Sequence, residues 1–461
     1  MFAREGVGFM PALYLAYLDK LSEEEKNELV GLESTELRAQ KICEHPFIIE
    51  TLKKIKVSGG KNLEKSIELR EEGNALYAAG KYNSALIKFS SAIIFAPINQ
   101  VDYSLALANR SACLQLLGYQ ERSLEDTILA EKAGYPQDKL YKILERRAQC
   151  LIKLGRKTEA KEEFEKANKL LDSSSLSQGA KDKFRGKMRE SLSAPFGSGE
   201  KKTWTDKAKE AKPNIRNELL KISSPNIQYP ALSSSVTVTS SPEQGRYVVA
   251  TQDIPPGTVI LSELPMTWVV ENARVGTTCS MCLGCILVLV PCNNCVHVSY
   301  CSIQCKNQAW DDHHSLECGF LTILFASGLN SFSNLALRAV CRSGGKYLLD
   351  NKEDILKICR KIPDSPCDIE KTGIFDGGDF KAGLSLVKHT ECLDRDEIIL
   401  RTLISALIAT CLRRTRFGES IENEDEAYYI AGVVYEILNS FPPNTHEIDI
   451  LQLKLLAIPT T

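Results

Sequence analysis

The apolar positions of residues 66–172 recur at helical spacing, with small side chains at fixed intervals. In the first copy of this pattern, successive positions lie 12, 4, 3 and 5 residues apart: Gly73, Ala85, Phe89, Ala92 and Pro97. A second copy repeats the first three spacings, 12, 4 and 3 residues, at Ala148, Ala160, Phe164 and Ala167. A weaker copy lies between them: Ser111, Ser123, Thr127 and Ala130. Small residues let two antiparallel helices approach closely, and an aromatic ring fills the remaining gap, so the pattern predicts repeated helix pairs.

Other stretches of the chain predict further helices and a small β part. The apolar run Phe9–Leu18 reads into "DKLSEEEK" and predicts a helix, as do Ser333–Val340 and the long stretch Glu397–Asn439. Residues 245–270 alternate β-branched and polar positions around "PPG", which predicts two short strands, 247–251 and 259–264, joined by a tight turn. The expected fold class is mostly α with a small β part.

Composition limits the classes of protein that fit. The chain has 461 residues, 43% hydrophobic and 25% charged, with a net charge of -2, which fits about two to four globular domains. This charge balance predicts no general attraction to nucleic acid or to an anionic membrane. No apolar run approaches the ~18 residues that span a bilayer. Phe9–Leu18 lacks the small-residue cleavage site of a secretory signal peptide. We therefore expect a chain of the cytoplasm or nucleus, whose 16 cysteines are reduced thiols and metal ligands rather than disulfides.

Half of the cysteines lie in residues 279–318, spaced C-x2-C-x9-C-x2-C-x5-C-x3-C-x8-H-x3-C. A CxxC turn delivers two thiolates to one ion, and a C-x3-C or H-x3-C pair does so from one face of a helical turn. Four such pairs predict two closed structural Zn²⁺ sites. A disulfide framework is the alternative for a secreted chain, and a catalytic zinc would need an open position that eight strong ligands do not leave.

This spacing resembles the MYND zinc finger, in which the ligand pairs interleave. The resemblance implies that one ion is held by Cys279, Cys282, Cys301 and Cys305, and the other by Cys292, Cys295, His314 and Cys318. Cys285 and His313 are spare candidates, and spacing alone also permits Cys282 with Cys285 as the first pair. MYND fingers dock proline-rich peptides, often through an aromatic residue, so Trp310 either binds a partner or packs the finger.

The strands before the finger resemble the opening of a SET domain, and the combination resembles the SET and MYND domain-containing family of protein-lysine methyltransferases. The resemblance implies that Gly245 and Arg246 contact S-adenosylmethionine, although Tyr247 replaces a frequent second glycine. It also implies that residues 319–461 form the family's helical insertion. None of the six histidines follows an asparagine, so the family's Asn-His-Ser-Cys segment is absent, and no later catalytic tyrosine is recognised. We therefore expect a catalytically incomplete chain, or alternatively a non-enzymatic adaptor.

The helix pairs resemble tetratricopeptide (TPR) repeats. In one TPR subclass, basic and asparagine side chains hold the C-terminal carboxylates of an Hsp90 or Hsp70 peptide. The matching positions here are Arg70, Asn74, Asn109, Lys142 and Arg146. Residues four apart on a helix face the same side, so each pair can point into one groove. The alternative is that these are ordinary solvated helix residues.

These observations divide the chain into six regions. They are an N-terminal helical extension (1–64), TPR repeats (65–172), a basic Ser/Lys-rich linker (173–240), N-terminal SET strands (241–278), the finger (279–318) and a truncated helical insertion (319–461). The linker's basic stretches could contact nucleic acid or act as a nuclear signal, but such segments are more often simple linkers. The protein lysine that the family methylates, a proline-rich finger ligand and a chaperone peptide are the expected partners.

Overall fold

The computed structural model describes residues 9–54, 59–193, 220–241, 245–286, 288–326, 331–360 and 373–446. Helices dominate these residues and only two small two-stranded sheets occur among them, so the predicted fold class is confirmed. The predicted helix Phe9–Leu18 is also confirmed, as α1. In the described part of the chain, no helix is long and apolar enough to cross a bilayer. The basic stretch at 201–212 lies outside the described residues.

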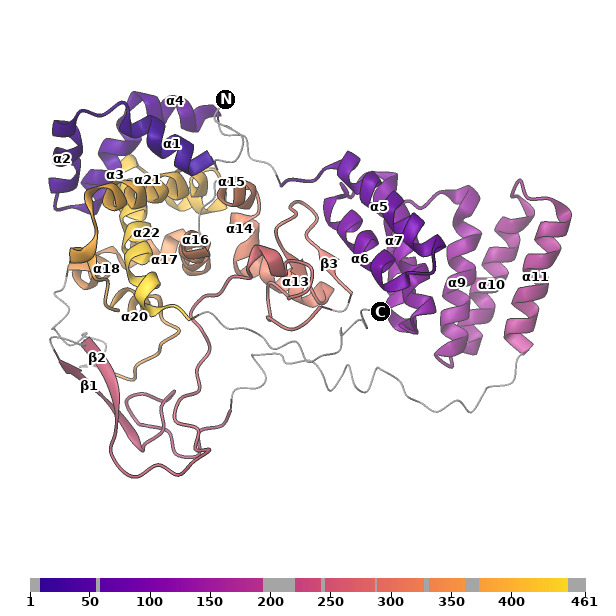
Figure 1. Cartoon of the computed structure of the whole chain (residues 1–461). Helices are drawn as coiled ribbons and strands as arrows, with labels where there is room; N and C mark the ends of the chain where they lie inside the picture. The colour runs from indigo at the N-terminus through magenta and orange to yellow at the C-terminus, as the bar shows by residue number, and fades with distance from the viewer. Residues whose placement is uncertain are drawn as a thin grey trace.

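Residues 63–172 form three antiparallel helix pairs that stack side by side (Figure 1). The pairs are α5 (Leu63–Ala78) with α6 (Tyr82–Phe95), α7 (Val101–Leu116) with α8 (Gln120–Lys132), and α9 (Leu140–Lys153) with α10 (Lys157–Asp172). The turn within each pair contains a left-handed glycine, Gly80, Gly118 or Gly155, with φ between 74° and 88°. Gly73 lies against the ring of Phe89, as the spacing of small and aromatic residues predicts.

A seventh helix extends this stack. α11 (Gln178–Ser193) packs against α9 and α10, and Phe184 meets Tyr141 edge to face at 5.5 Å between ring centroids. It lies within the segment that the sequence suggests is a linker. Its buried Met188 joins the core of the repeats, so this part of the linker belongs to the helical stack.

The N-terminal helices pack against helices from the far end of the sequence. They are α1, α2 (Glu23–Gly31), α3 (Thr35–Glu44) and α4 (Pro46–Lys54). Their partners share one core: α15 (Leu321–Ala326), α16 (Ser331–Ser343), α17 (Gly345–Asp350), α18 (Lys352–Arg360), α20 (Phe380–Leu384), α21 (Arg395–Leu412) and α22 (Glu424–Asn444). Figure 1 shows α3 beside α21 and α22. Polar contacts reinforce the packing, since Tyr14 donates to the carbonyl of Asp396 at 3.0 Å and Arg38 lies 4.9 Å from the ring centre of Tyr435.

The β part differs from the hairpin predicted for residues 247–264. Strand β2 (Gly245–Ala250) pairs antiparallel with β1 (Val236–Ser241), and Val238 lies opposite Val248. The segment 259–264 forms no strand, but it does make an isolated bridge between Leu261 and Leu232. The predicted pairing is therefore wrong, because alternation marks a strand without identifying its partner. That partner comes from the end of the expected linker.

The finger lies between the helix pairs and the large helical core (Figure 1). It contains β3 (Val290–Pro291), β4 (Ser299–Tyr300), α13 (Ile303–Ala309), the π-helical turn η4 (Trp310–His314) and α14 (Ser315–Glu317). On the repeat side, Arg110 of α7 donates to the carbonyl of Leu289 at 3.0 Å. Lys61 donates to the carbonyls of Ile94 and Cys292, at 2.7 and 2.9 Å. The finger therefore joins both helical units.

Candidate functional site

The structure gathers the first four predicted metal ligands, Cys279, Cys282, Cys301 and Cys305, around one point. The sulfur atoms of Cys282 and Cys301 lie 3.7 Å apart, and those of Cys301 and Cys305 lie 3.6 Å apart. Four sulfurs at Zn–S distances of about 2.3 Å would form a tetrahedron with edges of about 3.8 Å. The Ser302 side chain caps α13 by accepting from the backbone NH of Cys305, which fixes the start of the helix that carries this ligand. The donor set fits Zn²⁺.

The second group, Cys292, Cys295, His314 and Cys318, is more deeply buried. Sulfurs of Cys292 and Cys318 are 3.7 Å apart, and Nε2 of His314 lies 3.3 Å from the sulfur of Cys292. A Zn–N distance of about 2.0 Å gives an expected nitrogen–sulfur edge of about 3.5 Å. Three sulfurs and one imidazole nitrogen leave no open position, so this set fits a structural Zn²⁺.

The two spare candidates lie outside both groups. Cys285 is exposed and its backbone makes an isolated bridge with Thr278. His313 is buried, and its Nδ1 lies 3.1 Å from Asp312. The structure thus pairs Cys279, rather than Cys285, with Cys282. Trp310 is 38% exposed and meets the ring of His314 edge to face at 5.9 Å, which allows both packing and contact with a partner.

The five groove residues lie on the first helix of each pair: Arg70 and Asn74 on α5, Asn109 on α7, and Lys142 and Arg146 on α9. The amide of Asn109 donates to the Asn74 oxygen at 2.8 Å. Nη1 of Arg146 donates to the carbonyl of Ala108 and to the Ser111 hydroxyl, at 2.8 and 2.9 Å.

Charge is unevenly balanced in this groove. Arg70 pairs with Asp102 at 2.9 Å, so an acidic group already neutralises it. Lys142 is exposed and lies 6.0 Å from the ring centre of Tyr141. Burial lowers the pKa of Arg146, and no carboxylate among the described residues forms an ion pair with Arg146 or Lys142. The α9 end of the groove is therefore cationic.

Of the two residues expected at the cofactor, Gly245 begins β2 opposite Ser241. Nη2 of Arg246 donates to the Ser385 hydroxyl at 2.9 Å, and its guanidinium lies 5.7 Å from the ring centre of Phe375. The Arg246 side chain thus ties β2 to the segment after α20. Its backbone remains the part expected to contact S-adenosylmethionine.

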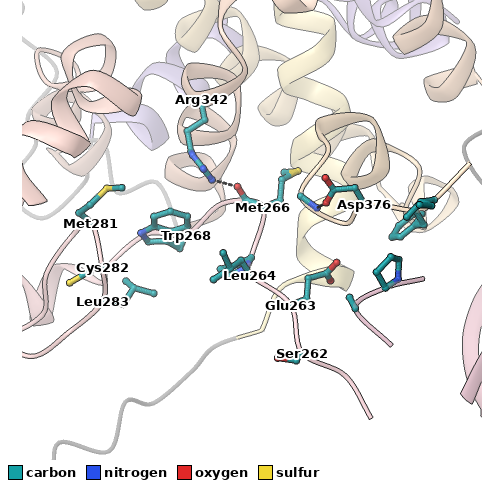
Figure 2. A pocket seen from close by; sticks show the side chains of 16 residues that line it. Ser262, Glu263, Leu264, Met266, Trp268, Met281, Cys282, Leu283, Arg342 and Asp376 are labelled. Carbon is teal, nitrogen blue, oxygen red and sulfur yellow. Dashed lines mark hydrogen bonds between the residues drawn. The ribbon is translucent and has the colours of Figure 1, made fainter. Parts of the chain in front are cut away.

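A cavity of about 620 Å³ lies between the segment after β2, the finger and residues 374–378 (Figure 2). Apolar side chains form much of its wall: Leu264, Met266, Trp268, Met281, Leu283 and Phe375. Glu263 and Asp376 also line it, and burial together with the Asp376 charge raises the pKa of Glu263. Sequence reasoning missed this cavity because its wall comes from segments more than 100 residues apart.

Comparison with known proteins identifies the finger and finds relatives of this chain. The family model of the MYND finger matches residues 279–318. The protein-lysine N-methyltransferases SMYD4 of Pongo abelii and Homo sapiens are each 31% identical to this chain over 331 residues. Each match covers 66% of this chain and 39% of the relative, so the chain spans about two fifths of those relatives' length.

One solved structure resembles part of the chain. It is the first TPR of Spaghetti (RPAP3) bound to the HSP90 peptide SRMEEVD, 22% identical, covering 29% of this chain and 98% of that one, with a TM-score of 0.24. The chain therefore contains a MYND finger at residues 279–318 and is similar to the SMYD4 protein-lysine N-methyltransferases over 66% of its own length.

Proposed function

We propose that this chain is the partner-docking part of an S-adenosylmethionine-dependent protein-lysine methyltransferase. Its helix-pair groove would hold the acidic C-terminus of an Hsp90 or Hsp70 peptide. Its finger, carrying two structural Zn²⁺ ions, would bind a second protein through a proline-rich segment. The observation that carries the groove proposal is the pair of cations on α9, Lys142 and Arg146, with which no described carboxylate forms an ion pair.

The chemistry of a peptide C-terminus suits this arrangement. A guanidinium removed from water without a counter-ion is costly, so a carboxylate that reaches Arg146 gains a charge-assisted hydrogen bond and relieves that cost. Asn74 and Asn109 lie next to each other and can offer amide donors. Arg70 is the weakest of the five, because Asp102 already accepts its hydrogen bond.

The groove is tested with the peptide SRMEEVD and its C-terminally amidated form, by calorimetry on the whole chain. The free acid should bind with micromolar affinity. Amidation, or the change Lys142→Ala with Arg146→Ala, should cost about 1.5–3 kcal/mol for each lost charged hydrogen bond. Arg156→Ala is the matched control, since Arg156 forms an ion pair with Glu159 on α10 and is not one of the five groove residues. Equal affinity for the two peptide forms would exclude the clamp.

The finger proposal is tested by metal analysis. The purified chain should contain two zinc ions. Cys301→Ser should release one of them, whereas the matched change Cys285→Ser should leave both in place, because Cys285 lies outside both ligand groups. One ion or none in the unmodified chain would contradict the eight-ligand assignment.

We propose that these 461 residues do not by themselves complete a methyl-transfer site. In-line transfer needs the cofactor methyl group and a neutral lysine amine held in close alignment. Gly245 and Arg246 would supply one side of the cofactor site, and the Asn-His-Ser-Cys segment that completes it in the family does not occur in this sequence. We therefore expect this polypeptide alone to give no radiolabel transfer from S-adenosylmethionine to protein. Transfer that a cofactor competitor abolishes would overturn this part of the proposal. The alternative is that the protein is a non-enzymatic adaptor. It predicts the same binding by the groove and the finger, but no methylation even by a polypeptide extended beyond these residues.

A further inference from the structure

Two arginines of α16, Arg338 and Arg342, reach from the finger to the wall of the cavity. They lie four residues apart and therefore point in the same direction from the helix. Each binds an acidic residue at the end of the finger and also a backbone carbonyl of the segment 266–268. The carbonyls of Met266 and Trp268 therefore both face α16.

Arg338 connects this segment to the second metal group. It donates to both oxygens of Glu317, at 2.7 Å each, and to the carbonyl of Trp268 at 3.0 Å. Oε1 of Glu317 lies 3.1 Å from Nδ1 of His314, whose other nitrogen faces the sulfurs of Cys292 and Cys295. Glu317 and Arg338 are 1% and 4% exposed. Burial alone would raise the pKa of Glu317, but Arg338 and the neighbouring histidines hold it well below its usual range.

Arg342 forms the second connection without touching a metal ligand. Its Nε donates to Asp312 at 3.0 Å, and its Nη1 donates to the carbonyl of Met266 (Figure 2). The guanidinium also lies 4.7 Å from the ring centre of Trp268. Arg342 therefore connects the same segment to Asp312. Because Arg338 and Arg342 lie on one helix, changing each in turn compares a connection that includes a metal ligand with one that does not.

Trp268 and Met266 form part of the cavity wall, so these contacts fix its shape. A ligand histidine that gives its second N–H to a carboxylate is held in one tautomer and orientation, and losing that carboxylate weakens metal affinity by about 10–100-fold. The same carboxylate here also orients Arg338. The metal group, the arginine and the wall thus share a single buried carboxylate.

We propose that Glu317 and Arg338 are positioning residues that join the second metal group to the cavity wall, so that a metal held by His314 keeps Trp268 in place. The inference rests on the proposed binding of zinc by this group. It assigns the finger a role toward the cavity, in addition to any role in docking partners. The wall should therefore loosen when the second ion leaves.

The test uses the whole chain loaded with zinc and a chromogenic chelator. Glu317→Gln keeps the shape of the side chain but removes its charge, and should speed release of one of the two ions by about 10–100-fold while the other is unchanged. Hydrogen exchange of peptides covering residues 262–270 should rise in the same variant. In the unmodified chain, that exchange should rise as the chelator removes the second ion.

Arg342→Met is the matched control, because it removes the contact with Met266 but leaves Glu317 and His314 untouched. This variant should raise hydrogen exchange near Met266. Its rate of zinc release should equal that of the unmodified chain. If Glu317→Gln fails to fold, Arg338→Lys replaces it and should give a smaller change in the same direction. Unchanged zinc release in the Glu317 or Arg338 variant would overturn the inference, as would an equal effect of Arg342→Met on release. A wild-type chain that binds fewer than two ions would instead refute the underlying zinc proposal.

Discussion

The contact between Gly73 and Phe89 predicts how much stability the chain loses when Gly73 is changed to alanine. Two effects oppose each other: overpacking against Phe89 and the removal of a glycine from a helix. A Cβ added at Gly73 would lie 2.6 Å from the Phe89 ring, closer than real Cβ atoms approach their neighbours. Phe89 is 1% exposed, so the ring cannot turn aside into solvent. Gly73→Ala therefore overpacks the seam between α5 and α6, at a typical cost of about 1–3 kcal/mol.

The same substitution also removes glycine from the interior of a helix, which favours folding by up to about 1 kcal/mol. The net loss of stability then lies between about 0 and 3 kcal/mol. Gly186→Ala in α11 isolates the packing term, because Gly186 is exposed in a helix interior and nothing lies within 4 Å of its added Cβ. The two alanine variants should differ by about 1–3 kcal/mol, with Gly186→Ala the more stable.

The assay is urea-induced unfolding of the whole chain, combined with hydrogen exchange resolved for α5 and α6, because a chain with several cores need not unfold in one step. Since Phe89 causes the clash, Phe89→Leu should be less damaging in the Gly73→Ala background than in the unmodified chain. Equal stability of the two alanine variants, or no coupling between positions 73 and 89, would refute this account of the seam.

Two further predictions concern buried groups elsewhere. Asp126 accepts hydrogen bonds from Nε and Nη2 of Arg110 at 2.7 and 2.8 Å, with both side chains 2% exposed, so Asp126→Asn should lower the free energy of unfolding by about 3–5 kcal/mol. A loss below 1 kcal/mol in urea unfolding would contradict this. Cys285 and Cys392 are exposed, whereas burial raises the pKa of Cys411 to about 12. Mass spectrometry of the native, zinc-loaded chain should show iodoacetamide on the first two and none on Cys411 at pH 7.5.

Local spacing explains which features the sequence could predict. The small and aromatic positions of the repeats lie within single helix pairs, and the CxxC and H-x3-C pairs lie within single turns, so the spacing predicts these local arrangements. The choice of Cys279 over Cys285, and the interleaving of the ligand pairs, came from the resemblance to the MYND finger. The helical positions of the five groove residues follow from the same repeat, whereas their role in binding stays a prediction. Glu317 carries no such signal, because its role depends on Arg338 and His314 meeting in space.

Long-range pairing explains what could not be predicted. The sequence predicts a strand at residues 247–251. In the structure this strand pairs with Val236–Ser241, which lies in a serine-rich segment. Residues 1–64 look like a separate extension, and only the folded chain shows Tyr14 beside Asp396. Neither Lys61 nor Arg110 carries a sequence signal for its contact with the finger.

The packing of α1–α4 against α21 and α22 also has a consequence for how the protein is made. About 340 residues separate the end of α4 from the start of α21. At about 5–20 residues per second, a ribosome needs about 20–70 s to synthesise them. Throughout that interval Met10, Leu13, Ile42 and Ile48, each at most 1% exposed in the finished fold, have no α21 or α22 to cover them. The helix pairs that follow α4 are held mainly by contacts between helices close in sequence, so they can fold soon after they are made. During synthesis, α1–α4 therefore leave the ribosome well before α21 and α22 can cover them.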